Sequence, residues 1–163
     1  MLDKMRRWAP RYLTLVWVAG LFVLINTVTR LGLLAFEGDV LNLHPWRMLP
    51  IMGVGLLYDL AAVSYMLIPF ALTALLLPNR GWGRQAHAVI ASLLVVTSIF
   101  AMLFTAVAEG LFWNEFAARF NFIAVDYLIY TRETLGNIRQ SFPLVPLLLG
   151  VVIASLKIGR AHV

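Results

Sequence analysis

The chain has 163 residues, of which 61% are hydrophobic and 13% are charged, and its formal net charge is +5. A soluble domain is about half apolar and about a quarter charged, and a short one has too little interior to bury so large an apolar fraction. Disorder is excluded by the same numbers, because disordered chains are polar and poor in aromatic residues. The composition therefore predicts that the protein is surrounded by lipid.

Four stretches of the chain are almost free of charge. A helix needs about 20 mostly apolar residues to cross the hydrocarbon core, and backbone groups inside lipid must be satisfied within the segment itself. The stretches also lack the alternating pattern of a barrel strand. We predict an all-α, polytopic transmembrane helical bundle with spans at about 12–35, 53–77, 86–108 and 143–157.

The first stretch follows a basic N-terminus, as the apolar part of a secretory signal peptide does. It is too long for a signal peptide, however, and no small-x-small cleavage site closes it before Arg30. We therefore expect an uncleaved first helix.

The distribution of basic residues predicts the orientation, because Lys and Arg accumulate on cytoplasmic ends. The N-terminus and the loop after the second span are basic, whereas residues 109–142 hold more acids than bases. We expect a cytoplasmic N-terminus, an outward-facing 109–142 segment and a multi-pass protein of the bacterial cytoplasmic membrane. The basic residues behind this prediction are Lys4, Arg6, Arg7, Arg11, Arg80, Arg84 and Lys157.

The same reasoning limits the possible partners and chemistry. The net charge of +5 is a topology signal, and with no basic patch on a soluble face we expect no nucleic-acid partner. The absence of cysteine excludes disulfides, thiolate chemistry and Cys-based metal sites. Membrane lipids are the expected surroundings.

Three polar residues, Asn26, Arg30 and Asp59, interrupt the apolar stretches. Ionisable groups in a membrane are costly and often mark a pathway or a partner. If the first helix runs outward and the second inward, Arg30 and Asp59 lie at similar depth, and their pairing lowers the cost of burying both. We favour a structural ion pair; the alternative is that Asp59 contacts a lipid headgroup or a mobile group. Gly53 and Gly55 are expected to permit close helix packing.

The outer segment, residues 109–142, is rich in aromatic side chains that recur at helical spacing. Glu115 and Arg119 have the i,i+4 spacing of a helical ion pair. This pattern predicts an amphipathic helix at the membrane surface. It is either a segment packed over the bundle, which the physical pattern favours, or a platform for lipid headgroups or an outer domain. The candidate contact residues are Trp113, Glu115, Arg119, Asn121, Asp126 and Tyr127.

No nucleophile–base pair, Walker, dinucleotide or metalloprotease pattern occurs, so we expect no catalytic and no metal-ligating residue in this chain. The outer segment nevertheless resembles the membrane half of bacterial lipoteichoic-acid-synthase-like proteins, which belong to the sulfatase and alkaline-phosphatase superfamily. The resemblance covers nearly all of the chain, from the first helix to about Lys157. Its most specific parts are the runs Phe112–Phe116, Arg119–Leu128, Tyr130–Glu133 and Gly136–Ile138, supported by Gly55–Leu60, Pro69 and Pro78.

The resemblance implies an N-terminal bundle of about five helices, a linker and a large extracytoplasmic catalytic domain. That domain carries a threonine nucleophile and a divalent metal, Mn or Mg, and it transfers or hydrolyses phosphoglycerol or similar groups. None of its catalytic positions has a counterpart here, so the sequence looks like a membrane domain truncated before the catalytic domain. The expected cofactor and the expected protein partner both belong to that missing domain.

The final residues, 158–163, break the pattern. They match one reading frame of a common sequencing-library adapter, so we expect them to be a non-native tail; the alternative is a short basic cytoplasmic tail.

Three hypotheses for function follow. The first is the membrane-anchoring portion of a lipoteichoic-acid-synthase-like phosphoglycerol transferase or hydrolase, inactive alone. The second is a small transporter or channel subunit that uses Asn26, Arg30 and Asp59, although no inverted repeat supports it. The third is an accessory protein whose outer helix docks a soluble enzyme.

Overall fold

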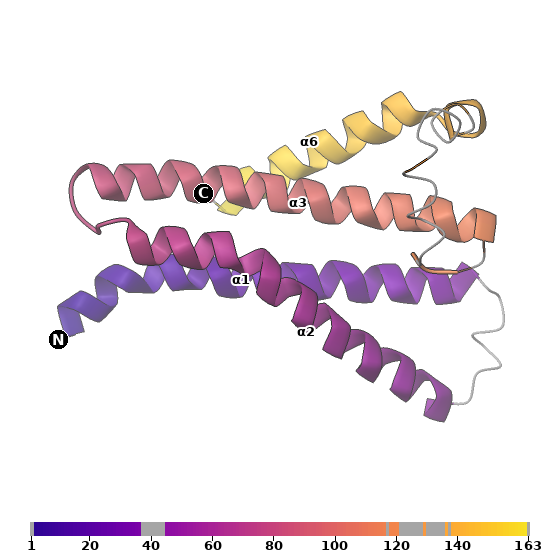
Figure 1. Cartoon of the computed structure of the whole chain (residues 1–163), viewed down its shortest axis with the longest axis horizontal. Helices are drawn as coiled ribbons and strands as arrows, with labels where there is room; N and C mark the ends of the chain where they lie inside the picture. Colours follow the sequence, from indigo (N-terminus) through magenta and orange to yellow (C-terminus); the bar gives the residue numbers. More distant parts are fainter. Residues whose placement is uncertain are drawn as a thin grey trace.

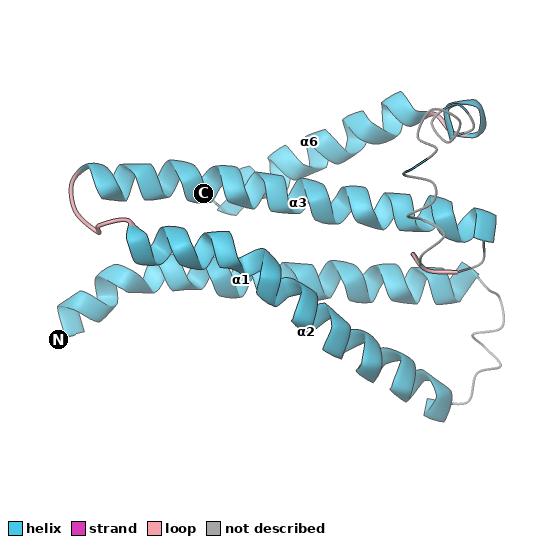
Figure 2. Ribbon diagram, viewed as in Figure 1, coloured by secondary structure: helices cyan, strands magenta, loops and turns pink. Residues whose placement is uncertain are grey.

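The protein is all-α in the part of the chain that the computed structural model describes, which is residues 2–36, 45–116, 118–120, 129, 136 and 138–162. Figures 1 and 2 show the long helices α1, α2, α3 and α6, and no strand is present in the described part. Their bounds are α1, Leu2–Phe36; α2, Pro45–Leu76; α3, Trp82–Phe116; and α6, Leu144–His162.

Three of these helices are long and apolar enough to cross a membrane: Arg11–Phe36 of α1, Met48–Leu76 of α2 and Trp82–Phe116 of α3. They contain the first and third predicted spans, and the second except for its last residue, Leu77. α3 is longer than the predicted 86–108, because the apolar helical pattern continues through residues 109–116. The fourth predicted span, 143–157, lies mostly in α6, and α6 also runs on through the residues that the sequence analysis assigns to a tail.

Successive helices run in opposite directions (Figure 1), and α1 contacts α2 and α3, while α6 packs on α3. One end of the bundle holds the Leu77–Gly81 turn between α2 and α3; we call it the proximal end. The other holds the C-termini of α1 and α3 and the N-terminus of α2, and we call it the distal end. α2 crosses α1, and its N-terminal half diverges from the bundle toward the distal end.

The core is small and lies where the three long helices meet. It consists of Val18 from α1, Phe70 from α2, and Val95, Ile99 and Met102 from α3. The buried share of each candidate span is only 6% in α1, 11% in α2 and 17% in α3. Apolar side chains that face outward need an apolar solvent, so this arrangement fits lipid and not water.

The proximal end is fixed by Arg11, whose side chain is 5% exposed. Its guanidinium donates hydrogen bonds to the carbonyls of Ala74 (3.3 Å), Leu77 (2.8 Å) and Pro78 (3.3 Å). The last carbonyls of a helix have no intrahelical partner, and a cation there also complements the helix dipole. Arg11 therefore caps α2 from α1.

Two glycines shape the same turn. Gly81 has φ +54°, which lies in the left-handed region that glycine adopts without strain. Gly83 is buried, and a Cβ atom at this position would overlap the ring and carbonyl of Pro78.

Gly83→Ala is expected to destabilise the protein by about 1–3 kcal/mol, because backbone must move to admit the methyl group. The thermal unfolding midpoint in detergent, followed by size-exclusion chromatography, measures this. Gly20→Ala is the matched control, since nothing lies within 4 Å of its Cβ position. Equal midpoints for both variants would contradict the packing described here.

Candidate functional site: a buried charge cluster

Arg30 on α1 and Asp59 on α2 form the predicted ion pair. Arg30 Nη2 donates to Asp59 Oδ2 at 2.7 Å, and the two residues are only 4% and 6% exposed. Burial of either charge alone would be costly in lipid, so each side chain compensates the other. The pair also joins α1 to α2 outside the hydrophobic core.

The two glycines near Asp59 have different surroundings. A Cβ atom at Gly55 would overlap the guanidinium of Arg30, so this glycine makes room for the ion pair. At Gly53 none of the described residues has an atom within 4 Å of the Cβ position. The expectation of close packing is therefore wrong for Gly53, and at Gly55 the close neighbour is an arginine side chain.

Arg119 pairs with Glu109 of α3 and not with Glu115, so the i,i+4 prediction is wrong. The prediction assumed a continuous helix, whereas α3 ends at Phe116 and Arg119 follows in a non-helical segment. Arg119 Nε donates to Glu109 Oε1, and Nη2 donates to Oε2 at 2.9 Å. This two-point contact is the strong form of an Arg–carboxylate pair. Glu109 is buried, whereas the Arg119 side chain is 38% exposed.

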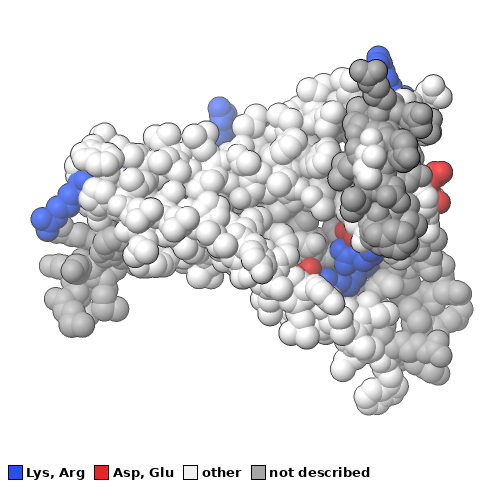
Figure 3. Space-filling model, viewed as in Figure 1, with Lys and Arg blue, Asp and Glu red and all other residues white. Residues whose placement is uncertain are grey.

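The two ion pairs are close enough to interact. The pKa of Arg119 is raised, first by its hydrogen bond to Glu109, and further by the charges of Glu109 and Asp59, against the opposing effect of burial. We call Arg30, Asp59, Glu109 and Arg119 the charge cluster. Figure 3 shows acidic and basic side chains side by side in a hollow near the distal end of the molecule.

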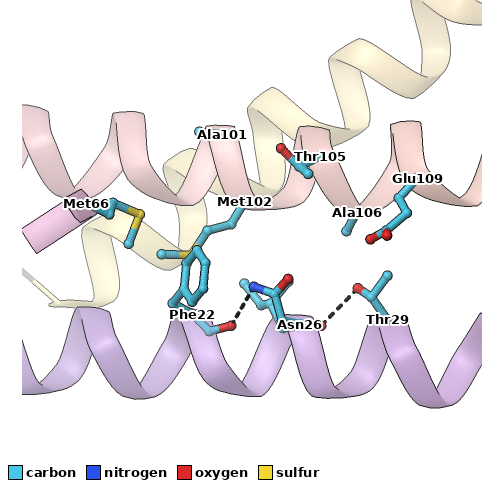
Figure 4. A pocket seen from close by; sticks show the side chains of 10 residues that line it. Phe22, Asn26, Thr29, Met66, Ala101, Met102, Thr105, Ala106 and Glu109 are labelled. Carbon is cyan, nitrogen blue, oxygen red and sulfur yellow. Dashed lines mark hydrogen bonds between the residues drawn. The ribbon is translucent and has the colours of Figure 1, made fainter. Parts of the chain in front are cut away.

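A cavity of about 140 Å³ with a mainly apolar lining lies beside the cluster, between α1 and α3 (Figure 4). Asn26, Thr29, Thr105 and Glu109 contribute its polar lining. Asn26 Nδ2 donates to the Phe22 carbonyl at 3.0 Å and Thr29 Oγ1 to that of Ile25 at 2.9 Å, so both also bond within their own helix. The polar groups therefore form a small part of the lining, at the end of the cavity that Glu109 closes.

The remaining predicted contact residues are only partly placed. Trp113 and Glu115 lie in the last turns of α3, where Glu115 is exposed. Asn121, Asp126 and Tyr127 lie outside the described residues. The aromatic contacts centre on Phe112, whose ring is 4.6 Å from that of Phe116 and 5.2 Å from that of Phe120.

These residues can hold charge and polar groups in an apolar environment. Within the described ranges, no group of three His, Cys, Asp or Glu residues could hold a metal ion. The cluster is suited to anchoring and to polar recognition.

Sequence reasoning missed Glu109 and Arg11 as buried contacts. Glu109 was assigned to the outer segment, and Arg11 was counted only as a cytoplasmic charge. The signal for Glu109 was present, because it stands alone in the apolar run from Thr105 to Trp113, as Asp59 does in its own run. No local signal identifies the contact of Arg11 with residues more than 60 positions away.

Comparison of the chain with protein-family models, with curated proteins and with solved structures found no match.

Asp59→Ala is expected to lower the free energy of unfolding by about 3–5 kcal/mol, because it leaves the Arg30 charge buried and unpaired. The double variant Asp59→Ala with Arg30→Ala should lose at least about 1 kcal/mol less than the sum of the single losses. Denaturant unfolding in mixed micelles measures the cycle. Strict additivity would refute the pair. Alanine substitutions of the exposed residues Arg84 and Glu115, which lie at opposite ends of α3, form the control cycle. Their effects on the free energy of unfolding should add.

Glu109→Gln is expected to increase tryptic cleavage after Arg119 about tenfold, because an arginine held by a carboxylate must be released before trypsin can bind it. The rate is measured by limited proteolysis and mass spectrometry in detergent. Glu115→Gln is the control and should leave the rate unchanged. An equal increase in both variants would show that Arg119 is not held by Glu109.

Proposed function

We propose that the chain is a four-span membrane domain with a cytoplasmic N-terminus, so that the proximal end faces the cytoplasm and the distal end faces outward. Two observations support this topology. Successive helices alternate in direction, and the loop at the proximal end carries Arg80 and Arg84 without an acidic residue. α6 is the fourth span.

Single-cysteine labelling tests the topology, because the chain has no cysteine of its own. Gln85 and Glu115 are both exposed and lie near opposite ends of α3. In intact cells, an impermeant maleimide should label Glu115→Cys and should label Gln85→Cys only after permeabilisation. The reverse pattern would show that the orientation is opposite to the one proposed. Labelling of both variants in intact cells would show that α3 does not cross the membrane.

The function we propose for this domain is to anchor a lipoteichoic-acid-synthase-like phosphoglycerol transferase or hydrolase, whose chemistry takes place outside the cytoplasmic membrane. The observation that carries the proposal is the Glu109–Arg119 pair. It ties the start of the segment that resembles this family to the distal end of the bundle. An extracytoplasmic catalytic domain, reached after α6 through a further span, would then lie beside this segment at the outer lipid surface.

Catalysis itself belongs to the extracytoplasmic domain in this proposal. That domain supplies the nucleophile and the Mn or Mg ion, and it is the principal protein partner of the bundle. The charge cluster has no part in bond making or breaking in this proposal.

The source DNA tests this function directly. The native gene is expected to continue after the codon of Lys157 with other codons in place of those of residues 158–163, through a fifth span and into a metal-binding domain with a threonine nucleophile. The product of that gene should release labelled phosphoglycerol from phospholipid vesicles with Mn or Mg, and the present chain should release none. A genomic stop codon directly after Val163, found in independent reads, would contradict the proposal.

A second candidate, a small transporter or channel subunit, is favoured by one observation, the cavity between α1 and α3 that Asn26 and Glu109 help to line. Flux through proteoliposomes, compared between the chain and its Asp59→Asn variant, separates the two functions. Substrate-dependent flux that Asp59→Asn abolishes would favour transport over anchoring.

A further inference from the structure

The charge cluster leaves one strong donor without an acceptor. Arg30 is 4% exposed, and its Nη1 atom is buried with no hydrogen-bond partner among the described residues. A buried polar group without a partner costs several kcal/mol in hydrocarbon, where bulk water cannot satisfy it. The acceptor for Nη1 is therefore expected to come from outside the chain.

Asp59 has an acceptor oxygen that complements this donor. Its hydrogen bond to Arg30 uses Oδ2, and its side chain keeps 8% of its surface exposed. A carboxylate accepts through both oxygens, so Asp59 Oδ1 can receive a further donor. The cluster thus presents an unused donor on Arg30 and an unused acceptor on Asp59, whose side chains are already bonded to each other.

The depth of Arg30 places this site at the border of the lipid headgroups. The span Arg11–Phe36 has 26 residues, which is about 39 Å of helix, against a hydrocarbon core of about 30 Å. If the excess helix length is shared equally between the two ends, each end protrudes from the hydrocarbon core by about 4–5 Å. Arg30 lies about 9 Å before Phe36 along the helix, so its backbone is about 4–5 Å inside the boundary between the hydrocarbon and the headgroups. An arginine side chain can bridge that distance. Arg119, at 38% exposure, is the most accessible member of the cluster, so a headgroup approaches past it.

The charge balance selects the kind of headgroup. Two arginines and two carboxylates sum to zero, so an anion alone would leave a net buried charge, which is costly in a low dielectric. A zwitterion keeps the sum at zero and supplies both missing partners. Its phosphate oxygen accepts from Arg30 Nη1, and its primary ammonium donates to Asp59 Oδ1.

We propose that the charge cluster is a binding site for an outer-leaflet phospholipid whose headgroup carries a phosphate and a primary ammonium group, as ethanolamine phospholipids do. The quaternary ammonium of choline lipids has no N–H to donate, and glycerol headgroups have no cation. The site therefore discriminates among lipids by hydrogen bonding at the ammonium. This inference rests on the proposed topology, but not on the proposed enzyme family.

Native mass spectrometry tests the site on the full chain, delipidated in detergent and then incubated with equal amounts of ethanolamine, glycerol and choline phospholipids of the same acyl composition. The ethanolamine lipid is expected to be retained about tenfold more than either other lipid, as for one hydrogen bond between charged groups. Equal retention of the three lipids, or preference for the glycerol lipid, would overturn the proposal. The cysteine labelling above reports the topology separately, so failure of the site and failure of the topology are distinguishable.

Arg30→Lys locates the site, because lysine keeps the charge opposite Asp59 but has a single nitrogen and no second arm for the phosphate. Its preference for the ethanolamine lipid should fall to less than about threefold. Arg11→Lys, a buried arginine at the proximal end, is the matched control and should keep the wild-type preference. An Arg30→Lys variant that folds and keeps the full preference would overturn the assignment. If Arg30→Lys does not fold, the retention of the three lipids by the wild-type chain still tests the proposal.

A competition experiment distinguishes binding of the whole lipid from binding of its free headgroup. Soluble O-phosphoethanolamine at millimolar concentration is expected to displace little of the bound lipid, because it lacks the acyl chains that contact the apolar helix surface. Complete displacement would show that the site takes the free headgroup, which would overturn the assignment to a membrane lipid.

Discussion

A charged side chain within a bilayer must find its partner inside the protein or at the headgroups, and the Arg30–Asp59 pair meets this requirement for α1 and α2. The hydrophobic effect does little to hold helices together in lipid, because the surrounding chains are as apolar as the side chains themselves. The small core around Val18 and Ile99 fits this view. Polar contacts then decide where the helices meet. Arg11 fixes α1 to the end of α2 at the proximal end, and Arg30 fixes the same two helices farther along.

Two glycines lie where the arginine contacts bring the chain close together. Gly55 lies against the Arg30 guanidinium, and Gly83 lies against Pro78 in the turn that Arg11 caps. In both places a methyl group would displace part of a charged or backbone contact. Gly159 on α6 differs, because the nearest atom to its Cβ position is a methyl group of Val96 on α3 and not a charged or backbone group. At the α3–α6 contact a methyl group would instead meet another apolar side chain.

The sequence was sufficient for the helical class, the three long spans and the Arg30–Asp59 pair, because each depends on a strong and local signal. Hydrophobic runs of span length are such a signal, and a lone ion of each sign at matching depth is another. The Glu115–Arg119 pair could not be predicted correctly, because i,i+4 spacing has meaning only inside a helix and the end of α3 at Phe116 carries no clear stop signal. The role of Arg11 depends on tertiary proximity to residues 74–78, which no local pattern encodes. The cavity beside Glu109 likewise arises only when α1 and α3 pack.

The spacing of the charged partners along the chain has a consequence for biosynthesis. Arg30 leaves the ribosome 29 residues before Asp59, whereas Glu109 precedes Arg119 by 10. At about 5–20 residues per second, α1 waits roughly 1.5–6 s for its counter-charge. During that interval a helix with an uncompensated arginine has reason to remain beside the insertion machinery and not to enter lipid alone. Insertion of α1 and α2 as a hairpin, with the ion pair already formed, avoids this cost, so the order of assembly is set by the position of Asp59.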